Sequence, residues 1–266
     1  MSSKSIGKRF EKLVTIVERL RAPDGCPWDR EQTSASLLPY LLEETYEVME
    51  SVDDRNWEVL KEELGDLLLH VVFQASIATD SDRFNIDESL KTVNEKLVRR
   101  HPHVFGDTKA NAAFKAKQNW EAEKQKEKKR DSRLDGVPVT LPGLVRAQRL
   151  QEKASYVGFD WEKIESVWEK VYEELQEIKL AQQGDNKDLL EEEIGDAIFT
   201  LVNLARFLGI PAEDALRKTN NKFINRFKMI EKELKKRGKT LEESSLDEMD
   251  EIWNAVKRKS KILLSS

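Results

Sequence analysis

An internal repeat constrains the fold of this 266-residue chain more than any other feature. Shifting the sequence by 130 positions places six acidic residues and one glycine of the first half on identical residues of the second half. The matched pairs are Glu43 and Glu173, Glu44 and Glu174, Glu47 and Glu177, Glu62 and Glu192, Glu63 and Glu193, Gly65 and Gly195, and Asp66 and Asp196. A shift of 126 positions places Lys96 on Lys222 and Arg100 on Arg226. Such self-similarity predicts two copies of one structural unit.

Apolar residues recur at three-to-four residue spacing along most of the chain, which is the pattern of amphipathic helices. The 11 glycines and 7 prolines lie between the periodic segments instead of recurring at the short intervals of an all-β protein. Charged residues at 36% and apolar residues at 39% fit a charge-coated helical protein with a buried core. The predicted helices cover residues 6–20, 37–52, 57–72 and 86–97, and then 141–155, 164–183, 187–208, 211–237 and 246–262.

These elements predict an all-α fold of two tandem four-helix units. We expect the first domain over residues 1–106 and the second over 141–266, joined by a charged and partly helical linker over 107–140. Glutamates interleave the lysines of this linker and aromatic residues are scarce, which is typical of a solvated helix face. The net charge of -5 also provides no positive field for a nucleic-acid backbone, so we expect no nucleic-acid partner.

The cysteine content and the start of the chain indicate a compartment. Cys26 is the single cysteine, which excludes an intrachain disulfide and is typical of a reducing environment. The first residues run into a charged amphipathic helix and contain no continuous apolar stretch. We therefore expect a cytoplasmic protein with no membrane partner.

The repeated acids suggest a site for divalent cations. Residues three apart on a helix are neighbours on one face, so Glu44 with Glu47, and Glu63 with Asp66, each form a two-carboxylate edge. Four clustered carboxylates repel one another unless cations neutralise them. Oxygen ligands favour Mg²⁺, Mn²⁺ or Ca²⁺. A di-iron bundle would need histidine where Asp66 and Asp196 stand, so that alternative fails.

Glycines and cations recur beside these acids. Gly65 and Gly195 lie in mid-helix, where glycine costs about 1 kcal/mol relative to alanine. Their recurrence indicates a close approach to the backbone, either by a neighbouring helix or by metal or substrate. The repeated cations lie four residues apart and share a helix face in each copy. They either pair with surface acids or hold phosphate oxygens.

Several segments of this chain resemble the MazG family, and the similarity covers roughly residues 6–260. The segments are Gly25-Cys-Pro-Trp-Asp29, Tyr40-Leu-Leu-Glu-Glu-Thr-Tyr-Glu47, Glu63-Leu-Gly-Asp66, Arg99-Arg-His-Pro-His-Val-Phe105, Val157-Gly-Phe-Asp-Trp161 and Val202-Asn-Leu-Ala-Arg206. The resemblance implies tandem MazG domains that use Mg²⁺, with Mn²⁺ as a substitute. It also implies hydrolysis of nucleoside triphosphates between the α and β phosphates, with broad base tolerance and a role in nucleotide-pool housekeeping. Pairing of bundles is implied as well, so we expect a homodimer or a higher homo-oligomer.

The resemblance also implies roles for individual residues. The metal ligands expected in the second copy are Glu174, Glu177, Glu193 and Asp196. The catalytic residues expected there are Glu173, Glu174 and Glu193, with Glu173 positioning water or metal. The expected nucleotide contacts are Lys170, Lys222, Arg226 and Trp253. The corresponding first-copy residues are the acids Glu44, Glu47, Glu63 and Asp66 and the cations Lys96, Arg99 and Arg100. The Trp253 segment has no evident counterpart after the first copy, so we expect the second copy to be the main site.

Two other functions are open at this level. The same site could serve one specific aberrant nucleotide or an alarmone. Alternatively, the chain could be a helical scaffold whose repeats only dimerise, without catalysis.

Overall fold

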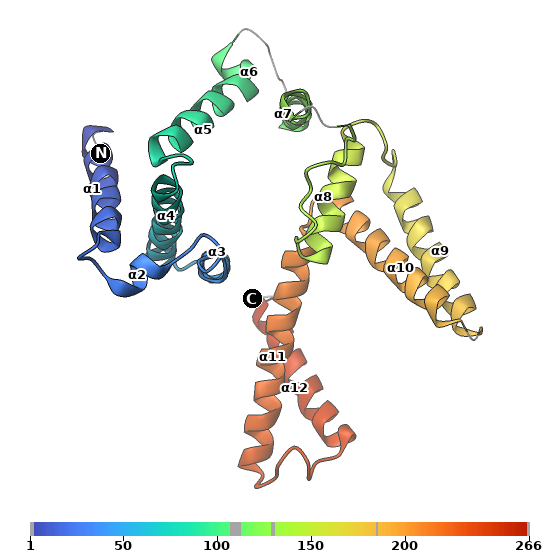
Figure 1. Ribbon diagram of the computed structural model, residues 1–266. Helices are drawn as coiled ribbons and strands as arrows, with labels where there is room; N and C mark the ends of the chain where they lie inside the picture. The colour runs from blue at the N-terminus through green and yellow to red at the C-terminus, as the bar shows by residue number, and fades with distance from the viewer. Residues whose placement is uncertain (1–2, 107–112, 129–130, 185, 265–266) are drawn as a thin grey trace. The chain divides into compact units, whose positions relative to one another are not determined.

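The structure is a computed structural model that describes residues 3–106, 113–128, 131–184 and 186–264. Every regular element in these ranges is a helix, which confirms the all-α prediction (Figure 1). The chain forms two compact units, Met1–Trp120 and Glu121–Ser266. The boundary between them falls inside a helix of the segment expected to be a linker, and residues 107–112 and 129–130 of that segment lie outside the described residues.

The first unit is built around a hairpin of two long helices. Its helices are α1 (Ser3–Arg21), α2 (Pro27–Glu31), α3 (Leu38–Asp53), α4 (Trp57–Asp80), α5 (Ile86–Arg100), α6 (Pro102–Phe105) and the first part of α7 (Ala113–Lys128). Helices α3 and α4 form the hairpin, and α1 and α5 pack against α4. The four long helices that precede α7 were predicted. The short helices α2 and α6 were not, because a segment of one turn is too short to show helical periodicity.

The second unit repeats this plan. Its helices are the remainder of α7, α8 (Gly143–Ser155), α9 (Ile164–Gln182), α10 (Lys187–Phe207), α11 (Ala212–Lys236) and α12 (Leu246–Leu264). Helices α9 and α10 form one hairpin, α11 and α12 form another, and α8 packs against α10 and α11. All five helices predicted over residues 141–262 are confirmed within a few residues at their ends.

Matched asparagines begin the second helix of each acid-bearing hairpin. The Asn56 side chain accepts a hydrogen bond from the backbone N–H of Val59 at the start of α4. The Asn186 side chain accepts from the backbone N–H groups of Asp188 and Leu189 at the start of α10. Such caps satisfy donors that have no partner within the helix. The two asparagines are 130 positions apart, so the same device starts the acid-bearing helix at the same position in both copies.

The buried apolar clusters are small and local. In the first unit Val17, Leu37, Val72 and Phe73 join α1, the start of α3 and α4. In the second unit one cluster lies between α9 and α10, and another lies between α11 and α12 around Leu234. Each hairpin of the second unit therefore has its own core.

Membrane-spanning character was examined in the described residues. No single helix there has both the length and the apolar character needed to cross a membrane. One strongly bent pair, α10 with α11, meets the length and composition test when the two are taken together.

A buried ion-pair network holds α7 to α8. The carboxylate of Glu121 lies 3.2 Å from the Lys153 ammonium and 3.0 Å from the Arg149 guanidinium, and Arg149 also pairs with Glu152. Glu121 is 7% exposed and Lys153 is 5% exposed. Burial raises the pKa of Glu121, but the surrounding cations outweigh it and hold that pKa below its ordinary value. Glu121 is therefore ionised and paired in the folded chain.

Removing Glu121 is expected to destabilise the second unit strongly. Glu121→Ala leaves the buried Lys153 ammonium without its carboxylate, and breaking a buried pair in this way costs about 3–5 kcal/mol. Urea denaturation of the full chain measures the change in the free energy of unfolding. Glu169→Ala, at an exposed position on α9, is the control and should change it by no more than about 0.5 kcal/mol. Equal stabilities of the two variants would show that the network contributes nothing specific.

Candidate metal centre

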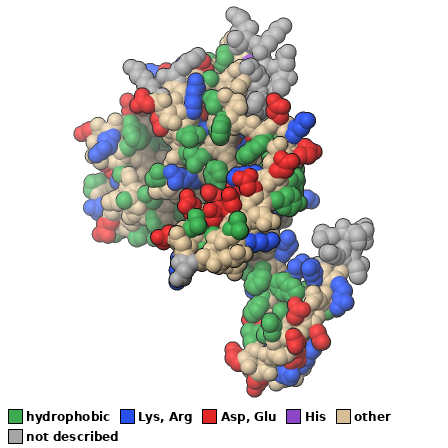
Figure 2. Space-filling view, turned by 90° about the vertical axis from the view of Figure 1, so that its right-hand side faces the viewer, with side chains coloured by type: hydrophobic (Ala, Val, Ile, Leu, Met, Phe, Trp, Pro, Cys, Tyr) green, Lys and Arg blue, Asp and Glu red, His purple; other side chains and the backbone are tan. Residues whose placement is uncertain are grey.

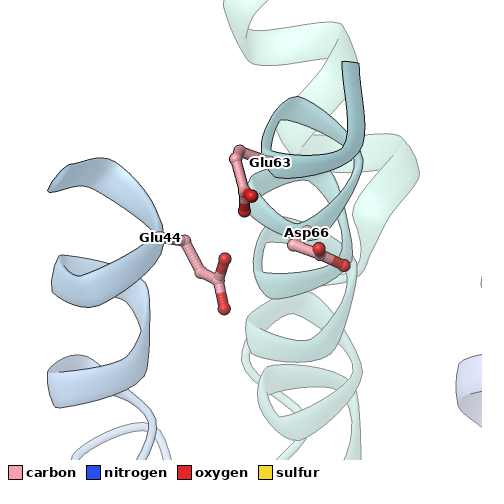
Figure 3. A group of neighbouring side chains, drawn as sticks. All are labelled: Glu44, Glu63 and Asp66. Atoms are coloured by element: carbon pink, nitrogen blue, oxygen red, sulfur yellow. The ribbon is translucent and has the colours of Figure 1, made fainter. Parts of the chain in front are cut away.

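The α3–α4 hairpin brings three carboxylates of the first copy together. Glu44 on α3 extends toward Glu63 and Asp66 on α4, as Figure 3 shows. One oxygen from each of the three lies within 4.8 Å of the other two. All three residues are partly buried, whereas Glu47, the fourth expected ligand, is exposed. The structure therefore gathers three of the four predicted acids and places Glu47 close enough to affect their charge.

Mutual repulsion makes this cluster electrostatically unfavourable without a cation. Burial, followed by the charges of Asp66, Glu47 and Glu63, raises the pKa of Glu44 to about 7. Burial and the neighbouring acids also raise the pKa of Glu63. Like charges disfavour the ionised form of a carboxyl group. A divalent cation would relieve the repulsion that these shifts report.

The α9–α10 hairpin forms the matching cluster in the second copy. Oxygens of Glu174, Glu177 and Glu193 lie within 4.8 Å of one another. Asp196 is exposed, but its charge contributes after burial and Glu177 to the raised pKa of Glu193. The remaining acid differs between the copies, because Glu47 is outside the first cluster and Asp196 outside the second. On the face seen in Figure 2, acidic side chains gather into one patch bordered by hydrophobic side chains.

Glu174 is the most deeply buried member of the second cluster. The residue is 3% exposed. Its Oε1 atom is 2.8 Å from the Lys170 ammonium, but its buried Oε2 atom has no hydrogen-bond partner among the described residues. A buried carboxylate oxygen without a partner is costly. This oxygen therefore needs a ligand that the described side chains do not supply.

A lysine distinguishes the second cluster from the first. Lys170 lies 2.8 Å from both Glu173 and Glu174, and these hydrogen bonds raise the pKa of Lys170 well above its ordinary value. Tyr40 occupies the corresponding position 130 residues earlier and packs edge-on against Trp28. The second cluster therefore has a built-in cation at a position where the first copy has an aromatic ring. Glu173, expected to be catalytic, is exposed and lies outside the three-carboxylate group.

The predicted cations and Trp253 lie on the helices that follow each acid-bearing hairpin. Lys222 and Arg226 are on α11, and the Arg226 guanidinium is 5.4 Å from the centre of the Trp253 ring on α12. Lys96, Arg99 and Arg100 are on α5, where Arg99 is exposed and Arg100 is buried. Arg100 lies 5.1 Å from the ring centre of Trp120 on α7, a residue to which the sequence pattern assigned no role.

The mid-helix glycines have open surroundings. A Cβ atom placed on Gly65 or Gly195 would meet nothing within 4 Å in the described structure. A neighbouring helix of this chain is therefore not the reason for glycine at these positions, and that alternative from the sequence is wrong. Approach by a metal, a substrate or another chain accounts for the open space.

The donor set fits Mg²⁺. The cluster offers only carboxylate oxygens, which suit hard cations such as Mg²⁺ and Mn²⁺. Oxygens on opposite sides of an octahedral Mg²⁺ are about 4.2 Å apart, because each bond is about 2.1 Å. The 4.8 Å span of each cluster is slightly larger, so small side-chain rotations would bring the oxygens into range. The unpartnered Oε2 atom of Glu174 is a suitable ligand atom.

The fold and these clusters define an all-α protein with two copies of a helical hairpin that presents carboxylates from both of its helices. The family model for the MazG nucleotide pyrophosphohydrolase domain matches the chain twice, at residues 32–105 and 162–230. These ranges contain the acids of the first and second copies, respectively. The chain belongs to the MazG family.

Curated relatives are similar along nearly the whole chain. The nucleoside triphosphate pyrophosphohydrolase/pyrophosphatase MazG of Thermotoga maritima is 50% identical, over 96% of this chain and 98% of the relative. The nucleoside triphosphate pyrophosphohydrolase of Escherichia coli K12 is 44% identical, over 94% of this chain and 97% of the relative. The similarity therefore extends over both copies.

Neutralising Glu44 is expected to stabilise the metal-free protein at pH 8. The pKa of Glu44 is about 7 in the folded chain, against an ordinary value of 4.5. The folded chain therefore holds this proton more tightly, and the free energy of unfolding falls as the pH rises from about 4.5 through 7. Glu44→Gln, which cannot ionise, should melt a few degrees above the wild type in EDTA at pH 8 and show no advantage at pH 4.

Thermal melts with EDTA and with Mg²⁺ provide this measurement. Glu50→Gln, at an exposed position on α3, is the control and should follow the wild type at both pH values. Excess Mg²⁺ should stabilise the wild type more than Glu44→Gln, because the ion binds the ionised cluster. A Glu44→Gln melting temperature at or below that of the wild type at pH 8 in EDTA would contradict the repulsion argument.

Proposed function

We propose that this chain is a cytoplasmic, Mg²⁺-dependent enzyme that hydrolyses nucleoside triphosphates to monophosphate and pyrophosphate. The single observation that carries the proposal is the partly buried three-carboxylate cluster of Glu174, Glu177 and Glu193 in a chain of the MazG family. The names of the Thermotoga maritima and Escherichia coli relatives support the same substrate class. Mn²⁺ is expected to substitute for Mg²⁺, and broad base tolerance fits nucleotide-pool housekeeping.

The carboxylates of the second copy would hold the metal against the triphosphate. Glu174, Glu177 and Glu193 would supply ligand oxygens, and Asp196 lies close enough to join them after a rotation of its exposed side chain. Bound Mg²⁺ supplies charge neutralisation for phosphate oxygens and makes a water molecule more acidic. We assign the positioning of the attacking water to Glu173, which is exposed beside the cluster.

The balanced reaction requires water and no other reactant. The water oxygen forms a bond to the α phosphorus, the bond from that phosphorus to the α–β bridging oxygen breaks, and pyrophosphate leaves. The water proton passes to a neighbouring base. Negative charge develops on the leaving group, and groups that stabilise this charge accelerate the reaction.

Lys170 has two successive partners in this scheme. In the metal-free structure its ammonium pairs with Glu173 and Glu174. Cations that bind Glu174 reduce the attraction between that carboxylate and Lys170. The lysine side chain is then free to contact phosphate oxygens, for which Lys acts as a point charge. Lys222 and Arg226 provide further positive charge on α11.

Trp253 is suited to stack on a base. Its ring is partly buried, packs against the Ile230–Leu234–Ile252 cluster and contacts Phe223 and Arg226. The ring is therefore fixed in position while part of it stays accessible. Base stacking on an aromatic ring is tolerant of sequence because every base has a π face. Such a contact supports acceptance of several bases.

Homodimerisation is supported by matching exposed apolar stripes. Leu64, Leu68 and Val71 on α4 are 51%, 41% and 52% exposed, and their spacing places them on one helix face. The residues 130 positions later on α10, Ile194, Ile198 and Leu201, are 44%, 48% and 48% exposed. Exposed apolar stripes mark interaction surfaces. Because both copies leave the same helix face uncovered, we assign this face to contact with a second copy of the chain.

Product analysis tests the enzymatic proposal. The full chain with Mg²⁺ should release pyrophosphate and monophosphate from a panel of triphosphates, and EDTA should abolish the release. Glu174→Gln and Glu193→Gln should each reduce kcat/KM on the order of 100-fold or more, because even residues outside the ligand set typically cost 10- to 100-fold. Glu191→Gln, at an exposed position on α10, is the matched control.

The panel also separates the alternatives. Turnover of a single aberrant nucleotide or an alarmone in place of the standard triphosphates would contradict the broad substrate range. Full activity in Glu174→Gln and Glu193→Gln would contradict the assigned site.

Charges on the apolar stripes should prevent assembly. The wild type should sediment with at least twice the 30.8 kDa mass of one chain. Leu68→Glu combined with Ile198→Glu should sediment as a monomer, because burying an unpaired carboxylate in an apolar interface is costly. Lys61→Glu combined with Lys187→Glu, at exposed polar positions of the same helices, should remain assembled. A monomeric wild type would contradict the assignment of this face.

A further inference from the structure

The first copy contains an arginine–tryptophan pair that matches the pair in the second copy. The Arg100 guanidinium is 5.1 Å from the ring centre of Trp120, and the Arg226 guanidinium is 5.4 Å from the ring centre of Trp253. Arg100 and Arg226 are already equivalent through the repeat, and each is followed by a tryptophan on a later helix. The structure therefore places Trp120 where the repeat requires a counterpart of Trp253.

The sequence around the two tryptophans supports this equivalence. Trp120 begins the segment Trp-Glu-Ala-Glu-Lys124, and Trp253 begins Trp-Asn-Ala-Val-Lys257. Both segments follow the pattern Trp-x-Ala-x-Lys, and both lie on helices. Arg100 and Trp120 are 20 positions apart, whereas Arg226 and Trp253 are 27 apart, so a single fixed shift cannot align both residues. The expectation that the first copy has no counterpart of Trp253 is therefore wrong.

Helix α7 consequently has a role beyond connecting two domains. The order of the long helices α1, α3, α4, α5 and α7 matches the order α8, α9, α10, α11 and α12. Acids lie on the second and third helices of each series, cations on the fourth and the tryptophan on the fifth. Both series thus carry the same residue types in the same order.

We propose that the first copy is a second nucleotide-binding site, in which Trp120 supports the base while Lys96 and Arg100 face the phosphates. This inference rests on the proposed function of the second copy and extends it to the other half of the chain. The site takes a nucleoside triphosphate with its divalent cation, since Glu44, Glu63 and Asp66 supply the carboxylates. An indole ring held against a guanidinium offers a fixed, flat surface for stacking.

A merely structural role explains the Trp120 contact less well. Trp120 is only partly buried and lies outside the Val17–Val72 core cluster of its unit. Its documented ring contact is with a cation instead of with that core. The same geometry recurs at Arg226 and Trp253, although the loops before the two tryptophans differ in length.

Binding stoichiometry in the full chain tests the proposal. The probe is α,β-methylene-ATP with Mg²⁺, which carries carbon at the α–β bridge and so cannot be cleaved there. Titration calorimetry of the wild type should give two equivalents per chain. Trp120→Met, which keeps apolar volume but removes the ring, should weaken one equivalent by about 5- to 150-fold. Trp120→Phe should retain most of that binding, and Trp253→Met should weaken the other equivalent.

Controls separate this inference from the proposed function. Trp57→Met, at a 66% exposed tryptophan of the same unit, should leave both equivalents unchanged, and circular dichroism melts should show every variant folded. One equivalent in the wild type, or two equivalents that Trp120→Met leaves intact, would overturn the inference. If triphosphates are still converted to pyrophosphate, the proposed function survives that result. Absence of pyrophosphate release with every triphosphate would instead overturn the proposed function.

Discussion

Repulsion between carboxylates held on adjacent helices is the constraint on which the rest of this structure depends. Glu44 and Glu174 are brought toward acids of the following helix by hairpin packing, and neither can move away without opening the hairpin. The apolar contacts between the helices oppose that repulsion. In the first copy the unfavourable charge appears as the pKa of about 7 for Glu44. A fold that keeps such charges together stores a preference for a cation, and the family uses that preference on phosphorylated substrates.

The two copies manage this repulsion differently. Lys170 neutralises part of the second cluster and allows Glu174 to be almost fully buried. Tyr40 gives the first cluster no such charge, and Glu44 stays partly exposed. An internal lysine competes with a divalent cation for the same carboxylate, but it also becomes available to phosphate once the cation binds. The first copy therefore lacks both the competitor and the extra phosphate contact, although its three carboxylates are similarly close.

The sequence predicted the long helices and the acid clusters because both depend on local spacing. Glu63 and Asp66 share a helix face whatever the packing, and the asparagine caps fix where the helix starts. Which acids gather depends on side-chain rotation, so Glu47 and Asp196 could not be separated from the others by spacing. Trp120 escaped notice because the loops before the two tryptophans differ by seven residues, which breaks the fixed register. Its contact with Arg100 requires folding to bring two distant segments together.

The distribution of apolar side chains indicates how such separate hairpins become one functional unit. Val167, Val171 and Leu204 are buried between α9 and α10, yet Ile194, Ile198 and Leu201 on the same α10 remain exposed. A two-helix hairpin can bury only one stripe of each helix, because its opposite face has no neighbour. Burial of the remaining stripe by a second copy would surround the carboxylates with apolar contacts. Water exclusion of that kind strengthens electrostatic attraction to a bound cation. Assembly and cation binding are therefore expected to reinforce one another, since each covers what the other leaves unfavourable.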